Sequence, residues 1–191
     1  IIKDKNIMIE IKQNLANVED FSSRIRTGEI LSGSGHKFTD ILNIGIGGSC
    51  LGPKMAIQAL VPYHDGPRCH FVSNIDSAHI SDTLQTLRPE TTLVIIASKT
   101  FKTLETLANT KIAIDWLRRG IPTFFQKNLV AVSSAPDEAL HYGIGQDRVF
   151  SFPDGVGGRY SIWGPIGLPL MIAIGKENFR EFLSGAETMD N

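Results

Sequence analysis

The chain has 191 residues, of which 42% are hydrophobic and 20% are charged, and its formal net charge at pH 7 is -1. This length predicts one main domain with an appended segment, and the composition is typical of a soluble globular protein. A net charge so close to zero does not indicate a nucleic-acid-binding surface, so no nucleic-acid partner is expected. No apolar run approaches the roughly 20 residues of a membrane helix, so no membrane association is expected either.

The two cysteines, Cys50 and Cys69, do not have the spacing of a zinc site or a disulfide framework, and we expect both to be reduced thiols. The five histidines also lack metal-ligand spacing, so no metal is expected. The first residues carry no signal peptide, which favours a cytoplasmic protein. Because the chain starts with Ile1 rather than Met and stops at Asn191 without an obvious terminus signal, we expect it to be a piece of a longer protein.

The first predicted element is a helix from Asn6 to Arg26. Apolar residues recur there every three or four positions: Ile7, Ile11, Leu15, Val18, Phe21 and Ile25. The following stretch, 27–37, contains three glycines and two serines, which favours a flexible connection. The sequence therefore predicts a leading helix and linker at 1–37 and a main domain at 38–191.

From Phe38 onward, short apolar runs alternate with helical patterns. The predicted strands are 41–46, 69–72, 93–97, 129–132 and 149–152. The predicted helices lie near 50–60, 77–87, 100–118, 135–142 and 160–174. This alternation predicts an α/β fold with a doubly wound, five-stranded parallel sheet flanked by helices. Ligands of such sheets bind beyond the carboxyl ends of the strands, so the loops after Ile46 and Ala97 are the expected site.

Three glycines in four residues follow the first predicted strand: Gly45, Gly47 and Gly48. Glycine lets the backbone approach a ligand closely, and Ser49 could cap the next helix or donate to a phosphate oxygen. The spacing does not fit the dinucleotide pattern G-x-G-x-x-G, because Cys50 stands at the third glycine position. A tight structural turn explains these glycines as well as a ligand site does.

The apolar run 93–97 predicts a strand buried on both faces. Hydroxyl and ammonium side chains follow it: Ser98, Lys99, Thr100 and Thr103. We expect residues 98–103 to open a helix, where free backbone N–H groups, the helix dipole and the lysine would favour an anion. Because Ser and Thr are also preferred N-cap residues, a plain helix start remains an alternative.

A third loop, 154–161, places Arg159 behind paired glycines and before an apolar stretch. A guanidinium there could hold a phosphate through two parallel hydrogen bonds or stabilise a developing oxyanion. The alternative is an ion pair between Arg159 and Asp154.

Together these motifs resemble the first sugar-isomerase (SIS) domain of the glucose-6-phosphate isomerase family. The matching segments are 43–49, 97–101 together with Thr103, and 156–161, with a fourth at 71–76. The resemblance implies a flavodoxin-like SIS fold and an aldose-ketose isomerase of glycolysis and gluconeogenesis. Such an enzyme interconverts glucose 6-phosphate and fructose 6-phosphate through a cis-enediol intermediate. It requires neither metal nor organic cofactor, and it is a homodimer.

The resemblance also implies roles for particular residues. The residues implied to contact substrate are Gly48 and Ser49, and those implied to hold the phosphate are Ser98, Lys99, Thr100 and Thr103. Arg159 would stabilise the enediolate and is the one catalytic residue expected in this chain. The glutamate base, the ring-opening histidine and a lysine of the family are expected beyond Asn191, with the second sugar-isomerase domain. The chain alone is therefore expected to be inactive, and a free-standing, non-catalytic sugar-phosphate-binding regulatory module is the alternative.

The sequence departs from the family pattern at five positions. Cys50 stands where Asp is usual, Lys102 where Thr is common, and Leu104 where Gln is usual. Pro153 and Gly155 stand where Trp is frequent. Lys102 would add positive charge beside the phosphate loop.

Overall fold

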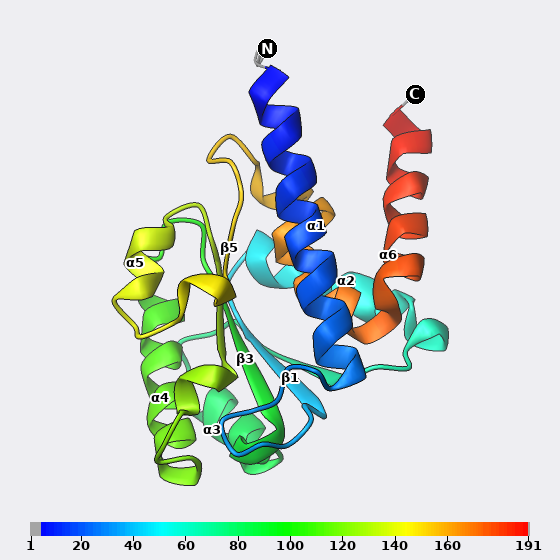
Figure 1. Ribbon diagram of the computed structural model, residues 1–191. Coiled ribbons are helices and arrows are strands. Elements are labelled where there is room, and N and C mark those ends of the chain that lie inside the picture. The colour runs from blue at the N-terminus through cyan, green and yellow to red at the C-terminus, as the bar shows by residue number, and fades with distance from the viewer. Residues whose placement is uncertain (1–4, 191) are drawn as a thin grey trace.

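The computed structural model describes residues 5–190 as an α/β fold around one five-stranded sheet (Figure 1). All strands are parallel and lie in the order β2-β1-β3-β4-β5. Their bounds are β1 Asp40–Ile44, β2 Arg68–Val72, β3 Thr92–Ala97, β4 Leu129–Ser133 and β5 Val149–Ser151. The predicted doubly wound parallel sheet is therefore confirmed, with strand ends within two residues of those expected.

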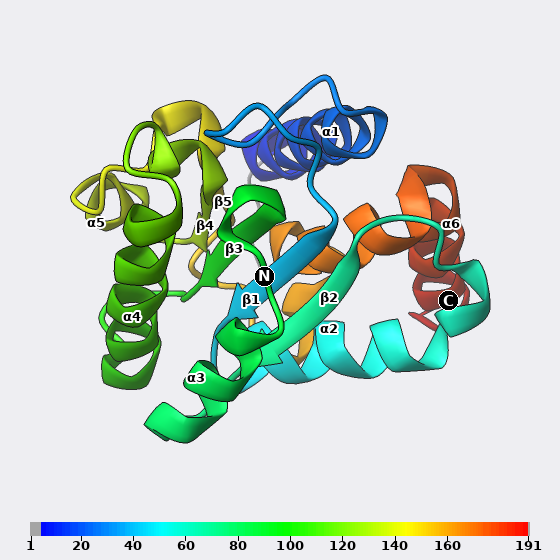
Figure 2. The same cartoon turned by 90° about the horizontal axis from the view of Figure 1, so that it is seen from below.

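Within residues 5–190, six α-helices cover the two faces of the sheet (Figure 2). Their bounds are α1 Lys5–Thr27, α2 Gly48–Ala59, α3 Ser77–Gln85, α4 Leu104–Gly120, α5 Pro136–Leu140 and α6 Leu168–Asp190. One face packs against α1, α2 and α6, and the other against α3, α4 and α5. None of the helices in the described part of the chain is long and apolar enough to cross a bilayer.

The central strand β3 shows why its sequence is apolar without interruption. Leu93 and Ile95 face the α1, α2 and α6 side, whereas Val94 and Ile96 face the α3, α4 and α5 side, and all four are 0% exposed. Because side chains of a strand alternate between faces, a strand covered on both sides needs apolar residues at every position.

The helix α1 packs against α6, and their free ends project to the same side of the molecule (Figure 1). Arg180 of α6 donates from Nε to Glu19 Oε1 at 2.7 Å and from a terminal nitrogen to Oε2 at 2.5 Å. Val18 and Phe21 of α1 pack in the same hydrophobic core cluster as side chains from the sheet. The division between a leading segment and a main domain at residue 37 remains a prediction.

Residues 28–39 form the connection between α1 and β1 and have almost no regular secondary structure. The backbone N–H of Gly33 donates to Asn128 Oδ1 at 2.8 Å, and the Asn128 amide nitrogen donates to the carbonyls of Pro89 and Thr92 at 3.0 and 2.8 Å. One fully buried side chain therefore ties this connection to β3, where the composition alone predicted only flexibility.

The predicted helix at 160–174 is correct only from Leu168 onward. Residues Gly158–Trp163 and Pro165–Gly167 form short 3-10 turns, and the helix α6 begins only at Leu168. Glycine and proline between 164 and 169 disfavour one continuous α-helix through this apolar stretch.

The helix α6 bends at Gly175, whose φ of 82° lies in the left-handed region. Arg26 of α1 donates to the carbonyl oxygens of Ile172 and Ala173 at 2.7 and 3.2 Å, just before the bend. These carbonyls lose their helical partners where the chain turns, so the guanidinium satisfies them. Glycine is the residue that adopts this backbone angle without strain.

Candidate functional site

The loops after β1 and β3 meet at the carboxyl edge of the sheet, where the strand order reverses. β1 pairs with β2 on one side and with β3 on the other. A Cβ atom on Gly45 would lie 2.8 Å from the carbonyl oxygen of Ala97. The backbone segments that follow β1 and β3 are therefore in close contact where they leave the sheet. This is the position at which the fold class predicted a ligand site.

The third loop also reaches this point. Gly48 is the first residue of α2, and a Cβ atom there would lie 2.3 Å from the carbonyl oxygen of Gly158. Arg159 is the next residue, on the first 3-10 turn after β5. The three segments that the sequence singled out therefore lie together. The approach of Gly158 to α2 is possible because Gly48 has no side chain.

The segment 98–103 does not open a helix, contrary to the prediction. Thr103 is the N-cap of α4, and the five residues before it form a loop. Phe101 has a φ of 53° and is 2% exposed, with its ring 5.4 Å from that of Tyr142. A left-handed residue breaks the helical path, and burial of the aromatic ring offsets its strain. The pattern could not reveal this reversal, because Phe is not a residue that signals positive φ.

The backbone of Lys99 is held firmly while its side chain extends into solvent. Its carbonyl oxygen accepts from Ser133 Oγ at 3.0 Å, from Ser134 Oγ at 2.8 Å and from the Ser134 N–H at 3.0 Å. Its Nζ lies 3.3 Å from Asp154 Oδ1. The neighbouring Lys102 has its Nζ 3.2 Å from Glu138 Oε1. Both lysines of the loop are thus paired with carboxylates from other segments.

The hydroxyl groups of this loop differ in exposure. Ser98 is buried, and its Oγ donates to Thr103 Oγ1 at 3.4 Å. Thr100 is exposed, and its Oγ1 accepts from the Lys102 N–H at 3.4 Å. The structure therefore brings Ser98 and Thr103 side by side and places Thr100 and Lys99 toward solvent.

Arg159 is exposed, and within residues 5–190 its guanidinium has no ion-pair partner. The alternative pairing of Arg159 with Asp154 is wrong, because the Asp154 carboxylate faces Lys99 instead. Ser161 steadies the turn that carries the arginine by donating from Oγ to the Gly158 carbonyl at 2.6 Å.

Two helix N-termini add to the positive character of the edge. α2 and α4 have 12 and 17 residues, and neither N-cap residue makes a side-chain capping hydrogen bond. The first N–H groups of a helix lack intrahelical partners and carry the positive end of the dipole. Together with Lys99 and Arg159 they form a place suited to an oxyanion.

Comparison with known proteins identifies the family. The family described as phosphoglucose isomerase matches residues 1–191. The chain belongs to this family. The resemblance drawn from the motifs is therefore confirmed.

Two curated relatives show how much of a phosphoglucose isomerase this chain spans. A glucose-6-phosphate isomerase of Ruegeria sp. (strain TM1040) is 54% identical over 189 residues, which are 99% of this chain and 35% of the relative. One of Ruegeria pomeroyi is 56% identical over 184 residues, which are 96% of this chain and 34% of the relative. The chain thus corresponds to a minor part of the length of these relatives.

A solved phosphoglucose isomerase shares the fold. The crystal structure of a glucose-6-phosphate isomerase from Chlamydia trachomatis matches with a TM-score of 0.84 at 31% identity, over the whole of this chain and 35% of that one. The agreement extends over every element of the sheet and its helices.

Within this phosphoglucose isomerase fold, the sequence analysis missed two buried asparagines, Asn43 and Asn109. Asn43 lies in β1 and is 0% exposed, and its Nδ2 donates to the Ser49 carbonyl at 3.1 Å. An amide among the apolar residues of a buried strand was a readable signal, because such a group needs a hydrogen-bond partner. Asn109 of α4 donates to the Asn74 carbonyl at 2.7 Å, and nothing in the sequence pattern indicated that link.

The cysteines and the histidines build no metal site in the described part of the chain. Cys50 and Cys69 are both free thiols. Burial raises the pKa of Cys50, although Ser73 and Lys54 oppose that shift, and burial and the Asp40 charge raise the pKa of Cys69 to about 12. Both thiols are therefore protonated at neutral pH and are poor nucleophiles.

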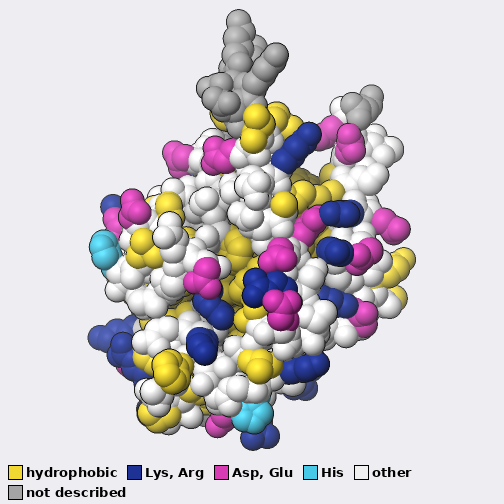
Figure 3. Space-filling model, viewed as in Figure 1, with side chains coloured by type: hydrophobic (Ala, Val, Ile, Leu, Met, Phe, Trp, Pro, Cys, Tyr) yellow, Lys and Arg dark blue, Asp and Glu magenta, His cyan; other side chains and the backbone are white. Residues whose placement is uncertain are grey.

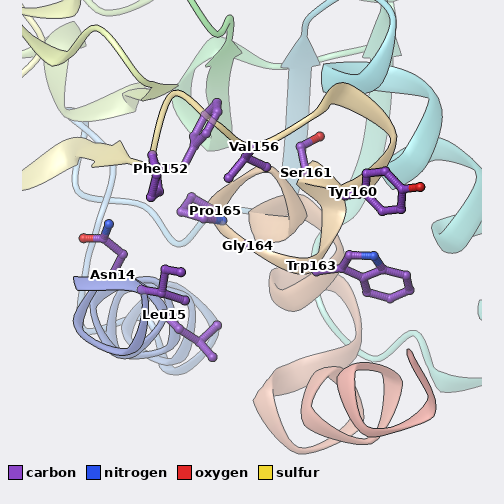
Figure 4. Close-up of a pocket in the computed structure, with 11 residues that line it drawn as sticks. Asn14, Leu15, Phe152, Val156, Tyr160, Ser161, Trp163, Gly164 and Pro165 are labelled. Carbon is purple, nitrogen blue, oxygen red and sulfur yellow. The ribbon is translucent and has the colours of Figure 1, made fainter. Parts of the chain in front are cut away.

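A small cavity of about 170 Å³ lies beside the arginine-bearing loop, between α1 and the segment 152–165 (Figure 4). Leu15, Phe152, Val156 and Trp163 give it mostly apolar walls. A cavity with mostly apolar walls does not suit a phosphate. On the face of the molecule that Figure 3 shows, cationic and anionic side chains are interspersed.

Proposed function

We propose that this chain is the sugar-phosphate-binding part of a glucose-6-phosphate isomerase, which interconverts glucose 6-phosphate and fructose 6-phosphate. The observation that carries the proposal is the contact of Gly48 with Gly158, since it joins the loop after β1, where α2 begins, to the loop that carries Arg159. The family membership and the names of the relatives support the substrate class.

In this proposal the phosphate lies on the loop after β3. Lys99 supplies the charge, and the hydroxyls of Ser98, Thr100 and Thr103 donate to the phosphate oxygens. In this proposal the backbone of Gly48 and the side chain of Ser49 contact the substrate from the loop after β1. The hydroxyls come from a folded loop rather than from a helix, so their arrangement depends on Phe101 and on Ser133 and Ser134 at the end of β4.

The chemistry follows from the charge that develops during isomerisation. After ring opening, a proton moves between adjacent carbons through a cis-enediol, and negative charge accumulates on oxygen. The Arg159 guanidinium stabilises that charge, as a cation does when it is positioned where negative charge develops. The glutamate base, the ring-opening histidine and a lysine come from other parts of the parent protein, which we propose is a cytoplasmic homodimer that needs no cofactor.

Calorimetric titration with fructose 6-phosphate tests the phosphate loop. Lys99→Ala should weaken binding by about 10- to 100-fold, because a charge-assisted hydrogen bond contributes roughly 1.5–3 kcal/mol. Lys176→Ala is the matched control, since Lys176 of α6 has a similar exposure, 42% against 44%, and also pairs with a carboxylate. Unchanged affinity of Lys99→Ala for fructose 6-phosphate would contradict the proposed role of this loop in phosphate binding.

The encoding gene separates the isomerase from the alternative class. An open reading frame that continues into a second sugar-isomerase domain supports the enzyme. One that ends at Asn191 would instead support a non-catalytic sugar-phosphate-binding module.

A further inference from the structure

The two lysines of the 98–103 loop are each paired with a carboxylate from a different segment. Lys99 pairs with Asp154, which follows β5, and Lys102 pairs with Glu138 of α5. Two positive and two negative side chains leave this cluster without formal net charge. A phosphate that approaches Lys99 therefore meets an ammonium group that already has an anionic partner.

The pair between Lys99 and Asp154 is weak enough to exchange. The Lys99 side chain is 44% exposed and that of Asp154 is 87% exposed, with 3.3 Å between Nζ and Oδ1. Exposed ion pairs contribute little to stability because water and salt screen them. A phosphate dianion carries more charge than a carboxylate and offers more acceptor oxygens, so it can displace Asp154 from Nζ.

The exchange needs movement of side chains alone. Three hydrogen bonds from Ser133 and Ser134 fix the Lys99 carbonyl, so the backbone is held with or without the carboxylate. Asp154 is therefore not required to position the loop. The contact of Asp154 with Lys99 Nζ therefore weakens the electrostatic attraction between Lys99 and the ligand.

We propose that Asp154 competes with the phosphate of the ligand for Lys99 Nζ and thereby sets the affinity of the site for phosphorylated ligands. This inference rests on the proposed function, since it requires the 98–103 loop to bind phosphate. Asp154 is then an affinity-determining residue rather than a structural counterion. A residue that oriented Lys99 would have the opposite effect when removed.

Titration of the complete gene product with inorganic phosphate and with fructose 6-phosphate tests the competition. Asp154→Asn keeps the shape of the side chain and removes its charge, and it should tighten binding of both ligands by roughly two- to five-fold. In a Lys99→Ala background the same substitution should change nothing, because the competitor has lost its target. The gain should shrink as ionic strength rises. Asp82→Asn, an exposed carboxylate of α3, should leave affinity unchanged.

The outcomes separate this inference from the proposed function. Unchanged or weaker binding by Asp154→Asn, with Lys99→Ala impaired, overturns the competition but leaves the phosphate loop intact. Tighter binding by Asp154→Asn that persists in the Lys99→Ala background also overturns the competition. In that case the Asp154 carboxylate would repel the phosphate directly rather than compete for Lys99. Failure of the wild-type protein to bind either ligand overturns the proposed function and this inference together.

Discussion

The Gly48 backbone lies so close to that of Gly158 that no methyl group fits between them. At this position the identity of one residue decides whether two loops meet. Side chains such as Ser49 and Arg159 can act on one ligand only if the backbones that carry them stay in contact.

Gly48→Ala should therefore separate the loops. Overpacking of this kind costs about 1–3 kcal/mol of stability, and a shift of about 1 Å breaks hydrogen bonds to a ligand, so binding of fructose 6-phosphate should fall by about tenfold or more. Calorimetry and urea denaturation measure the two effects. Gly185→Ala is the control, because nothing lies within 4 Å of its added methyl group, and alanine in a helix should stabilise by roughly 0.5–1 kcal/mol. Equal behaviour of the two variants would contradict the close approach.

A second residue with a specific role lies at the opposite edge of the sheet. Asp40 is buried at the start of β1, where it accepts from Thr39 at 2.8 Å and Arg68 at 3.2 Å and lies 2.9 Å from His70 Nε2. Burial alone would raise the pKa of the Asp40 carboxyl, but the hydrogen bonds from His70, Thr39 and Arg68 outweigh it and lower the pKa.

The lowered pKa makes the stability contribution of Asp40 depend on pH. The folded pKa lies below the unfolded value of about 3.9, so the contribution is complete above that value and is lost as pH falls through the folded pKa. Asp40→Asn should be less stable than wild type near neutral pH, and the difference should shrink below about pH 4. Urea midpoints across pH measure it, with Asp82→Asn as the exposed control. A difference that stays constant down to low pH would show that the charge of Asp40 does not matter.

At the scale of elements, the strands were the easiest part to predict. A strand buried on both faces, such as β3, leaves an unbroken apolar run whose physical cause is visible in the sequence. Loops and helix starts were harder, because their conformation depends on contacts with distant residues. Phe101 turns the chain before α4 because its ring has a site next to Tyr142, far away in the sequence.

The central strand should be the least tolerant element. Ile95→Ala removes a fully buried side chain of β3 and should cost about 2–5 kcal/mol. Ile9→Ala changes the same residue type on α1, where it is 67% exposed, and should stay within about 0.5 kcal/mol of wild type. Denaturant unfolding of both variants measures the contrast, and a similar loss in both would contradict the assigned core.

At the scale of the whole molecule, the chain forms one layered α/β unit that spans 35% and 34% of two relatives. α1 and α6 pack together and project beyond the sheet on the same side (Figure 1). In the proposed function, this chain holds the phosphate and stabilises charge, and other parts of the parent supply the proton-transferring groups.

The isolated 191-residue chain should therefore show no isomerase activity above background, whereas the complete gene product should be active. General acid and base groups contribute about 10²- to 10⁴-fold each, so their loss is decisive even where substrate still binds. A coupled assay of fructose 6-phosphate formation measures both proteins. Robust turnover by the 191-residue chain would refute this division of roles.

The sequence by itself determined the sheet, the alternation of strands and helices, and the three segments worth examining. It could do so because burial on both faces and glycine-rich turns leave local signals in residue type. Tertiary structure alone decided that Asp154 faces Lys99 rather than Arg159, that Asn109 ties α4 to the loop after β2, and that residues 98–103 form a loop. These outcomes depend on which side chains meet across the fold, and residue type at one position does not encode the distance to a partner far along the chain.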